Sequence, residues 1–152
     1  MMAKYRQLTK EELLSFEKEF IDFLVVNGII ADDWVKIKSA QKEKAESIIA
    51  HFSDVIFEGI MRKVNYLEFV SPKSIKCFQC LEKEIILVGI DAEQDTEIDF
   101  TLENWNKNVS NLKVYTQTKA YHKQRELELF DLVQSGAKIN DGKLFKQLCL
   151  AL

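Results

Sequence analysis

The hydrophobic period of the chain changes near residue 64, and this change limits the fold more than any other feature of the sequence. Before it, apolar residues spaced three and four apart over residues 41–63 predict one long helix. After it, short runs rich in β-branched and aromatic residues predict strands. A chain that passes from helices into a meander of strands and back into helices is expected to form an α+β fold with an antiparallel sheet.

Four strands are predicted, over residues 64–70, 75–81, 84–90 and 112–118. Glu82 and Lys83 lie between the second and third runs and predict a tight hairpin, although they lack the favoured Asn-Gly sequence. We therefore expect a small antiparallel sheet of about four strands, packed against N-terminal and C-terminal helices.

Helices are predicted on both sides of these strands. Thr9 and Glu12 have the spacing of a capping box, and they begin a helix that Gly28 ends. Asp32 is expected to cap the short helix that follows. Three further helices are predicted: one capped by Thr101 that contains Trp105, one over residues 127–134, and one capped by Asn140 that contains residues 144–152.

The composition is that of a soluble globular domain. The chain has 152 residues, of which 47% are hydrophobic and 30% are charged, and one Pro and five Gly leave little room for linkers. No stretch approaches the roughly 18 apolar residues of a membrane span, and the N-terminus lacks the apolar run of a secretion signal. We therefore expect a single domain over residues 1–152, in the cytoplasm and without membrane contact.

Charge and cysteine content narrow the function classes further. The net charge is −3, which disfavours general nucleic-acid binding because an acidic chain gains little from counterion release on a phosphate backbone. The cysteines are Cys77, Cys80 and Cys149. Their odd number predicts free thiols in a reducing compartment.

Cys77 and Cys80 form a C-x-x-C sequence, a spacing that occurs in both redox sites and metal sites. Both fall within a predicted strand, where residues three apart lie ~10 Å from each other and point to opposite faces. A disulfide needs Cα atoms within about 7 Å. A zinc site would need more ligands, and Cys149, His51 and His122 are scattered along the chain. We therefore predict buried free thiols, with no metal and no cofactor.

Two patterns of carboxylates also suggest chemistry. Asp54 and Glu58 lie one helical turn apart, as in a general acid–base pair or half of a di-metal site. No Glu-x-x-His completes such a site, so Asp54 is expected to be a buried carboxylate that the backbone or an Arg satisfies. Acidic residues alternate over residues 91–99, a pattern that could bind Ca²⁺ or a basic partner. The run lacks the Gly and the final Glu of an EF-hand, which favours a solvated loop.

Aromatic and basic side chains gather where the last strand enters a helix: Tyr115, Lys119, Tyr121 and Arg125. Helix N-termini favour anions, and Lys or Arg beside Tyr can hold a phosphate or stack on a base. The alternative is a solvated helix start with packing tyrosines, and no Gly-rich phosphate loop accompanies the cluster. Neither G-x-S-x-G nor H-E-x-x-H occurs, so no catalytic residue is predicted.

Residues 4–11, with the sequence K-Y-R-Q-L-T-K-E, resemble the opening of a family of small bacterial proteins of unknown function. Further similar segments are residues 19–24, 52–54, 58–59, 63–68 and 115–121. The resemblance covers nearly the whole chain and implies a bacterial, cytoplasmic, single-domain protein. It assigns no site and no activity, and the pair Cys77 and Cys80 departs from its pattern.

Two functions of different classes remain open. The first is a non-enzymatic protein-interaction or regulatory module, either homodimeric or with a protein partner. The last segment is apolar on more than one side, so it must dock on its own domain or on a partner through Leu144, Phe145, Leu148 and Leu152. Unpaired sheet edges offer a second route.

The second is a binding protein or enzyme for a small phosphorylated or acidic ligand. Its binding residues would be Tyr115, Lys119, Tyr121 and Arg125, with Asp54 as the base. The absence of catalytic motifs favours the interaction module over this alternative.

Overall fold

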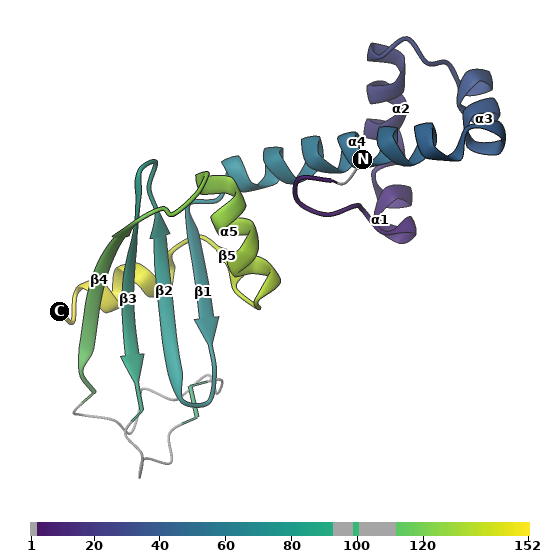
Figure 1. The fold of residues 1–152 in the computed structure, drawn as a ribbon. Helices are drawn as coiled ribbons and strands as arrows, with labels where there is room; N and C mark the ends of the chain where they lie inside the picture. Colours follow the sequence, from purple (N-terminus) through teal and green to yellow (C-terminus); the bar gives the residue numbers. More distant parts are fainter. Residues whose placement is uncertain (1–2, 93–98, 101–111) are drawn as a thin grey trace. The chain divides into compact units, whose positions relative to one another are not determined.

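A computed structural model describes residues 3–92, 99–100 and 112–152 (Figure 1). The chain divides into two compact units, Met1–Ile60 and Met61–Leu152. Our expectation of a single domain over the whole chain therefore stays a prediction. The helix capped by Thr101, and the acidic residues 93–98, lie outside the described residues. In the described part of the chain, no helix is both long enough and apolar enough to cross a membrane.

The N-terminal unit is helical. Its helices are α1 (Lys10–Ser15), α2 (Glu17–Val26), α3 (Ala31–Ala40) and the larger part of α4 (Lys42–Arg62), the long helix that the sequence predicts. The capping box is confirmed, because the Thr9 hydroxyl accepts from the Glu12 N–H at 3.2 Å and the Glu12 carboxylate accepts from the Thr9 N–H at 2.9 Å.

Two helix boundaries differ from the prediction. The helix expected to run without interruption to Gly28 breaks at Phe16, whose φ of −105° and ψ of 25° leave the helical range. The cap of α3 is Ile30, not Asp32, and the Asp33 carboxylate accepts from the Ile30 N–H at 3.5 Å. An acidic side chain near the first turn thus still satisfies a free donor, one position later than predicted.

Aromatic rings form the centre of this unit. Phe20 of α2 meets Trp34 of α3 edge to face at 5.1 Å, and it packs against Phe52 of α4 at 5.0 Å. Phe52 is almost fully buried. Such pairs contribute about 0.5–1.5 kcal/mol beyond the burial of their area, so they fix how α2, α3 and α4 pack.

The second unit contains an antiparallel sheet with strand order β4-β3-β2-β1-β5 (Figure 1). The strands are β1 (Tyr66–Val70), β2 (Ser74–Cys80), β3 (Glu84–Asp91), β4 (Val114–Ala120) and β5 (Lys138–Asn140). The predicted α+β class and antiparallel sheet are confirmed. The sequence analysis missed β5, because three residues carry no measurable period and only pairing with β1 makes them a strand.

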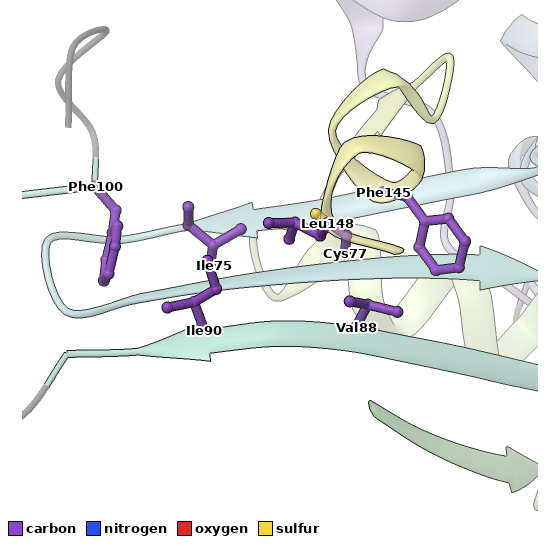
Figure 2. Packing of buried hydrophobic residues seen from close by; sticks show 7 residues of the cluster. All are labelled: Ile75, Cys77, Val88, Ile90, Phe100, Phe145 and Leu148. Atoms are coloured by element: carbon purple, nitrogen blue, oxygen red, sulfur yellow. The ribbon is translucent and has the colours of Figure 1, made fainter. Parts of the chain in front are cut away.

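Helices α5 (Arg125–Gln134) and α6 (Lys143–Cys149) pack on opposite faces of the sheet. On one face, Phe145 and Leu148 of α6 meet Ile75, Cys77 and Val88 in a buried cluster (Figure 2). The alternate residues of these strands lie beside α5 on the other face.

The start of α6 also differs from the prediction. Asn140 does not cap it directly; its side chain accepts from the N–H of Gly142, which is the cap. Gly142 has a φ of +81°, and a Cβ there would lie 2.6 Å from the ring of Tyr66. Only glycine fits both the left-handed backbone and this close approach.

Gly89 of β3 lies against the Tyr115 ring. A Cβ at residue 89 would lie 2.6 Å from that ring and 2.9 Å from the Ile75 carbonyl oxygen. We therefore expect Gly89→Ala to lower the free energy of unfolding by about 2 kcal/mol, the usual cost of overpacking, as measured by urea denaturation. Tyr115→Ala should rescue only part of the loss, because the clash with Ile75 involves backbone.

The matched control is Gly59→Ala, on α4. A Cβ at residue 59 meets nothing within 4 Å. This substitution should raise the free energy of unfolding by about 0.5–1 kcal/mol, because alanine favours the helix interior. Equal effects of the two alanines would contradict the close packing at Gly89.

Candidate functional site

Arg125 is the most heavily bonded side chain at the predicted ligand cluster. Its guanidinium donates to four backbone carbonyls: at 3.1 Å to Met61, Cys80 and Leu81, and to Val64. An ion pair to Glu126 at 3.9 Å completes its surroundings. A guanidinium has five N–H donors, so little of its hydrogen-bonding capacity remains for a ligand.

Tyr121 shares this structural environment. Its hydroxyl donates to the Leu81 carbonyl at 2.7 Å, the same oxygen that receives the Arg125 Nε–H. Burial, the main cause, raises the pKa of Tyr121 to about 12. The phenol therefore stays protonated and acts as a hydrogen-bond donor over the whole physiological range.

Tyr115 and Lys119 lie elsewhere on β4. The Tyr115 hydroxyl approaches Asp91 at 3.5 Å, and burial together with this carboxylate raises the pKa of Tyr115. The Lys119 ammonium pairs with Glu128 of α5 at 3.4 Å. Tyr115 and Lys119 line two different hollows. The four predicted binding residues are thus not gathered around one space, and their role in ligand binding stays a prediction.

The hollow beside Lys119 has a volume of about 300 Å³. Its lining includes the apolar Phe78, Leu87 and Leu132 and the carboxylates Glu128 and Asp131. Both carboxylates are paired, Glu128 with Lys119 and Asp131 with Lys123. These pairs leave little net charge at the hollow, so its apolar side chains suit a neutral group better than the phosphate that the sequence suggests.

Asp54 and Glu58 bind the N-terminal segment of the chain. The two oxygens of Asp54 accept from the backbone N–H groups of Lys4 and Tyr5 at 2.9 and 3.0 Å. Glu58 accepts from the Tyr5 hydroxyl at 2.6 Å and pairs with the Lys4 ammonium at 3.5 Å. Asp54 is half-buried instead of buried, and the backbone satisfies it. A carboxylate that binds main chain in this way is poorly placed to act as a base.

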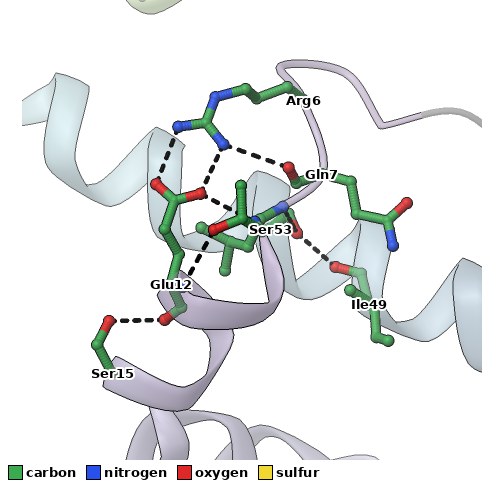
Figure 3. A network of polar contacts seen from close by, with 8 residues as sticks. Arg6, Gln7, Glu12, Ser15, Ile49 and Ser53 are labelled. Atoms are coloured by element: carbon green, nitrogen blue, oxygen red, sulfur yellow. Dashed lines mark hydrogen bonds and ion pairs between the residues drawn. The ribbon is translucent and has the colours of Figure 1, made fainter.

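The same segment is fixed by a second polar network (Figure 3). Ser53, fully buried, accepts from the Leu8 N–H at 2.9 Å and donates to the Ile49 carbonyl at 2.7 Å. Arg6 donates twice to Glu12, at 2.8 and 2.9 Å. The motif that opens the chain therefore acts structurally: it attaches residues 4–9 to α4 and begins α1.

The cysteines are free thiols, as predicted, and Cys77 and Cys80 are buried while Cys149 is half-buried. Burial is the main cause that raises the pKa of Cys77 to about 12 and that of Cys80 to about 11. Thiols with such values are inert at neutral pH. Among the described residues, no group of three or more His, Cys, Asp or Glu side chains could hold a metal ion.

The proposed contact surface at the C-terminus is corrected in part. Phe145 and Leu148 are buried against the sheet of their own unit, and Leu144 packs beside them, so these three do not present an exposed face. Leu152 is exposed. Docking on the chain's own domain, one of the two outcomes considered, is the one observed. A homodimer or other protein partner stays a prediction.

The N-terminal unit contains an apolar groove that the sequence analysis did not identify. It has a volume of about 540 Å³ and lies between α2 and α3, with residues of α1 and α4 completing it. We call it the α2–α3 groove after the helices whose residues Phe20, Ile21, Val25, Trp34 and Val35 line it.

The groove arises because α2 is apolar on two sides. Phe20 and Leu24 form one i,i+4 pair and are buried in the unit. Ile21 and Val25 form a second pair and leave 51% and 60% of their surface exposed. The sequence signal for this second stripe is the apolar pair four residues apart. It is less conspicuous than the larger aromatic residues of the same helix.

Comparison with known proteins gives one match. A family model described as "Family of unknown function (DUF6495)" matches residues 1–152. No curated protein and no solved structure matches the chain.

The structural role of Arg125 can be tested by substitution. Arg125→Ala leaves four backbone carbonyls without their charged donor, and we expect the free energy of unfolding to fall by about 3 kcal/mol in urea denaturation. Arg125→Lys should recover little of this loss, because an ammonium cannot reach four acceptors. The control Lys123→Ala breaks only the exposed pair with Asp131 and should cost at most about 1 kcal/mol. A loss as small as the control's would return Arg125 to the ligand-binding candidates.

The bond between Arg6 and Glu12 predicts a pH dependence. The Arg6 hydrogen bond is the main cause that lowers the pKa of Glu12 from 4.5 to about 2. The folded-state pKa lies below the unfolded one, so this stabilisation is present above pH 4.5 and is lost as the pH falls towards 2.

Glu12→Gln should therefore lower the free energy of unfolding at pH 7, by about 1 kcal/mol or less because the pair is a third exposed. The difference from wild type should vanish between pH 4.5 and 2 in acid titrations followed by circular dichroism. Glu11→Gln removes a charge from the same helical turn without touching Arg6 and separates the two effects. A constant difference across this range would exclude the proposed ion pair.

Proposed function

The chain belongs to DUF6495, a family of unknown function, and we propose that it is a protein-interaction module whose α2–α3 groove binds an amphipathic helix of a partner. The observation that carries the proposal is the surplus of apolar surface on this unit. Leu14, Ile21, Val25 and Val35 line the groove and expose between 51% and 65% of their surface. Clustered exposure of this kind marks binding surfaces in soluble proteins.

The dimensions of the groove suit a helix. Its walls are α2 and α3, each of ten residues and therefore about 15 Å long. Three turns of an incoming helix have that length and present apolar anchors at positions i, i+4 and i+7. The aromatic floor of Phe20 and Trp34 offers the contacts that such anchors use in helix-in-groove complexes.

Charged residues give the groove a direction. Lys10, Glu17 and Lys38 line it, at the starts of α1 and α2 and at the end of α3. Within the described part of the chain, none of the three forms an ion pair. Two positive charges against one negative favour a partner helix that places a carboxylate beside Lys10 and Lys38.

The alternative function, binding of a phosphorylated or acidic ligand, has less support. Arg125 is occupied by four carbonyls, and Lys119 is paired with Glu128. An anion would have to displace these contacts. The hollow beside α5 suits a neutral group instead.

The groove can be tested with two synthetic helices. Each has 12 residues with leucines at positions i, i+4 and i+7, and the two differ by Glu or Lys at the end that meets Lys10 and Lys38. In a Trp105→Phe background Trp34 is the sole tryptophan, so its fluorescence reports on the groove. We expect the Glu peptide to bind several-fold more tightly than the Lys peptide, because charges at a binding surface select between partners.

Ile21→Asp is expected to weaken binding of the Glu peptide at least about tenfold, since it places a charge in an apolar contact. Val55→Asp is the matched control, because Val55 is 48% exposed in the same unit but does not line the groove. Circular dichroism should show both variants folded. Equal binding by wild type and Ile21→Asp, or no binding of either peptide, would contradict the proposal.

A further inference from the structure

β4 forms one edge of the sheet, and in the described part of the chain no strand pairs with its outer side (Figure 1). It is seven residues long and pairs with β3 in an unbroken register from Val114 to Ala120. Residues 116–120 are all exposed. The opposite edge, β5, has only three residues. A long, regular and exposed edge is a template for another strand.

The sequence of this edge is complementary to itself. Residues 113–121 read K-V-Y-T-Q-T-K-A-Y. Consider two copies whose β4 strands pair antiparallel with Gln117 opposite Gln117. A residue a given number of positions before Gln117 in one copy then lies opposite the residue the same number of positions after Gln117 in the other copy. The opposed pairs are Tyr115 with Lys119, Thr116 with Thr118, Val114 with Ala120, and Lys113 with Tyr121.

Three of these four pairs are of kinds that stabilise neighbouring strands. Thr–Thr pairs exchange hydrogen bonds across strands, and a lysine can lie over the ring of a tyrosine opposite it. The Lys119 side chain is 55% exposed, and in the dimer its ammonium would exchange the ion pair with Glu128 for this contact. Residues opposite each other in an antiparallel pair point to the same face, so both copies keep α5 on one side and α6 on the other.

Neighbouring registers are less favourable. Pairing about Thr116 would place Lys113, the residue before β4, opposite Lys119, and pairing about Thr118 would align only residues 116–120 of the two strands. Like charges directly opposite destabilise a strand pair. A register shifted by a single residue would place α5 of one copy and α6 of the other on the same side of the continued sheet. Pairing about Gln117 alone aligns the two strands over their full length and avoids the lysine pair.

We propose that a second copy of this chain pairs with β4 in antiparallel register about Gln117, so that one sheet continues through a homodimer. The proposal is independent of the α2–α3 groove, which lies in the other unit and uses other residues.

The test is sedimentation equilibrium of the full chain at about 1–100 μM, the range in which many weak dimers form. Wild type is expected to be a dimer. Thr116→Lys combined with Thr118→Lys puts lysines opposite lysines in the proposed register and should raise the dissociation constant at least about 100-fold. Thr116→Lys combined with Thr118→Glu changes the same exposed positions but opposes lysine to glutamate, and it should remain dimeric.

Cross-linking checks the register. With Gln117→Cys, the two thiols would lie directly opposite each other, at a Cα separation of about 4.5–5.5 Å that a disulfide can span. Thr116→Cys alone should not cross-link in this register, but its mixture with Thr118→Cys should. All variants carry Cys149→Ser, because Cys149 is half-buried while Cys77 and Cys80 are buried.

Three results would overturn the proposal: a monomeric wild type at 100 μM, a dimer that survives the double lysine substitution, or cross-links that do not follow the predicted pairs. Ile21→Asp, which tests the groove, should leave the dimer intact. Loss of the dimer in that variant would assign the contact to the groove instead of β4.

Discussion

The guanidinium of Arg125 joins stretches of chain that are far apart in sequence. Its acceptors are the carbonyls of Met61 and Val64, which lead into β1, and those of Cys80 and Leu81, which lead out of β2. All four carbonyls lie where regular structure ends. The Met61 carbonyl also accepts from the Val64 N–H, and the Leu81 carbonyl also accepts from the Tyr121 hydroxyl. A planar cation with donors in fixed directions satisfies several acceptors at once, which a neutral side chain cannot do. This one side chain thus connects the start of α5 to the segment before β1 and to the end of β2.

In the N-terminal unit, part of the apolar surface remains exposed to solvent. Its aromatic centre is compact, yet Ile21, Val25 and Val35 remain exposed along one side. Residues 4–9 are bound to α4 through Ser53 and Asp54 and do not line the groove.

Local signals in the sequence were sufficient for much of the fold. The capping box at Thr9, the long helix α4 and the first four strands each depend on residues close together in the chain, so periodicity and cap chemistry identified them. The break at Phe16 and the strand β5 could not be found in this way. The first is a single residue leaving the helix, and the second exists only through pairing with β1.

The candidate site also depends on contacts between residues far apart in the chain. Sequence reasoning picked out Tyr121 and Arg125 as unusual, and both are, but their partners are carbonyl oxygens up to 64 residues away in the chain. A backbone carbonyl leaves no trace in composition or motif, so a buried structural cation and a ligand-binding cation look alike in sequence. The α2–α3 groove was missed for a different reason: its exposed pair, Ile21 and Val25, alternates with a buried pair on the same helix.

The two buried thiols lie on opposite sides of the same strand, and this gives the second unit a pair of built-in reporters. Cys77 lies beneath α6, and Cys80 lies on the face that α5 covers. A thiol reagent can reach each only when the helix above it detaches, so the two alkylation rates measure two separate opening equilibria of one sheet. The half-buried Cys149 reacts in the same experiment without full opening and calibrates the reagent. The native chain can thus show, without any added label, whether its two layers open together or one at a time.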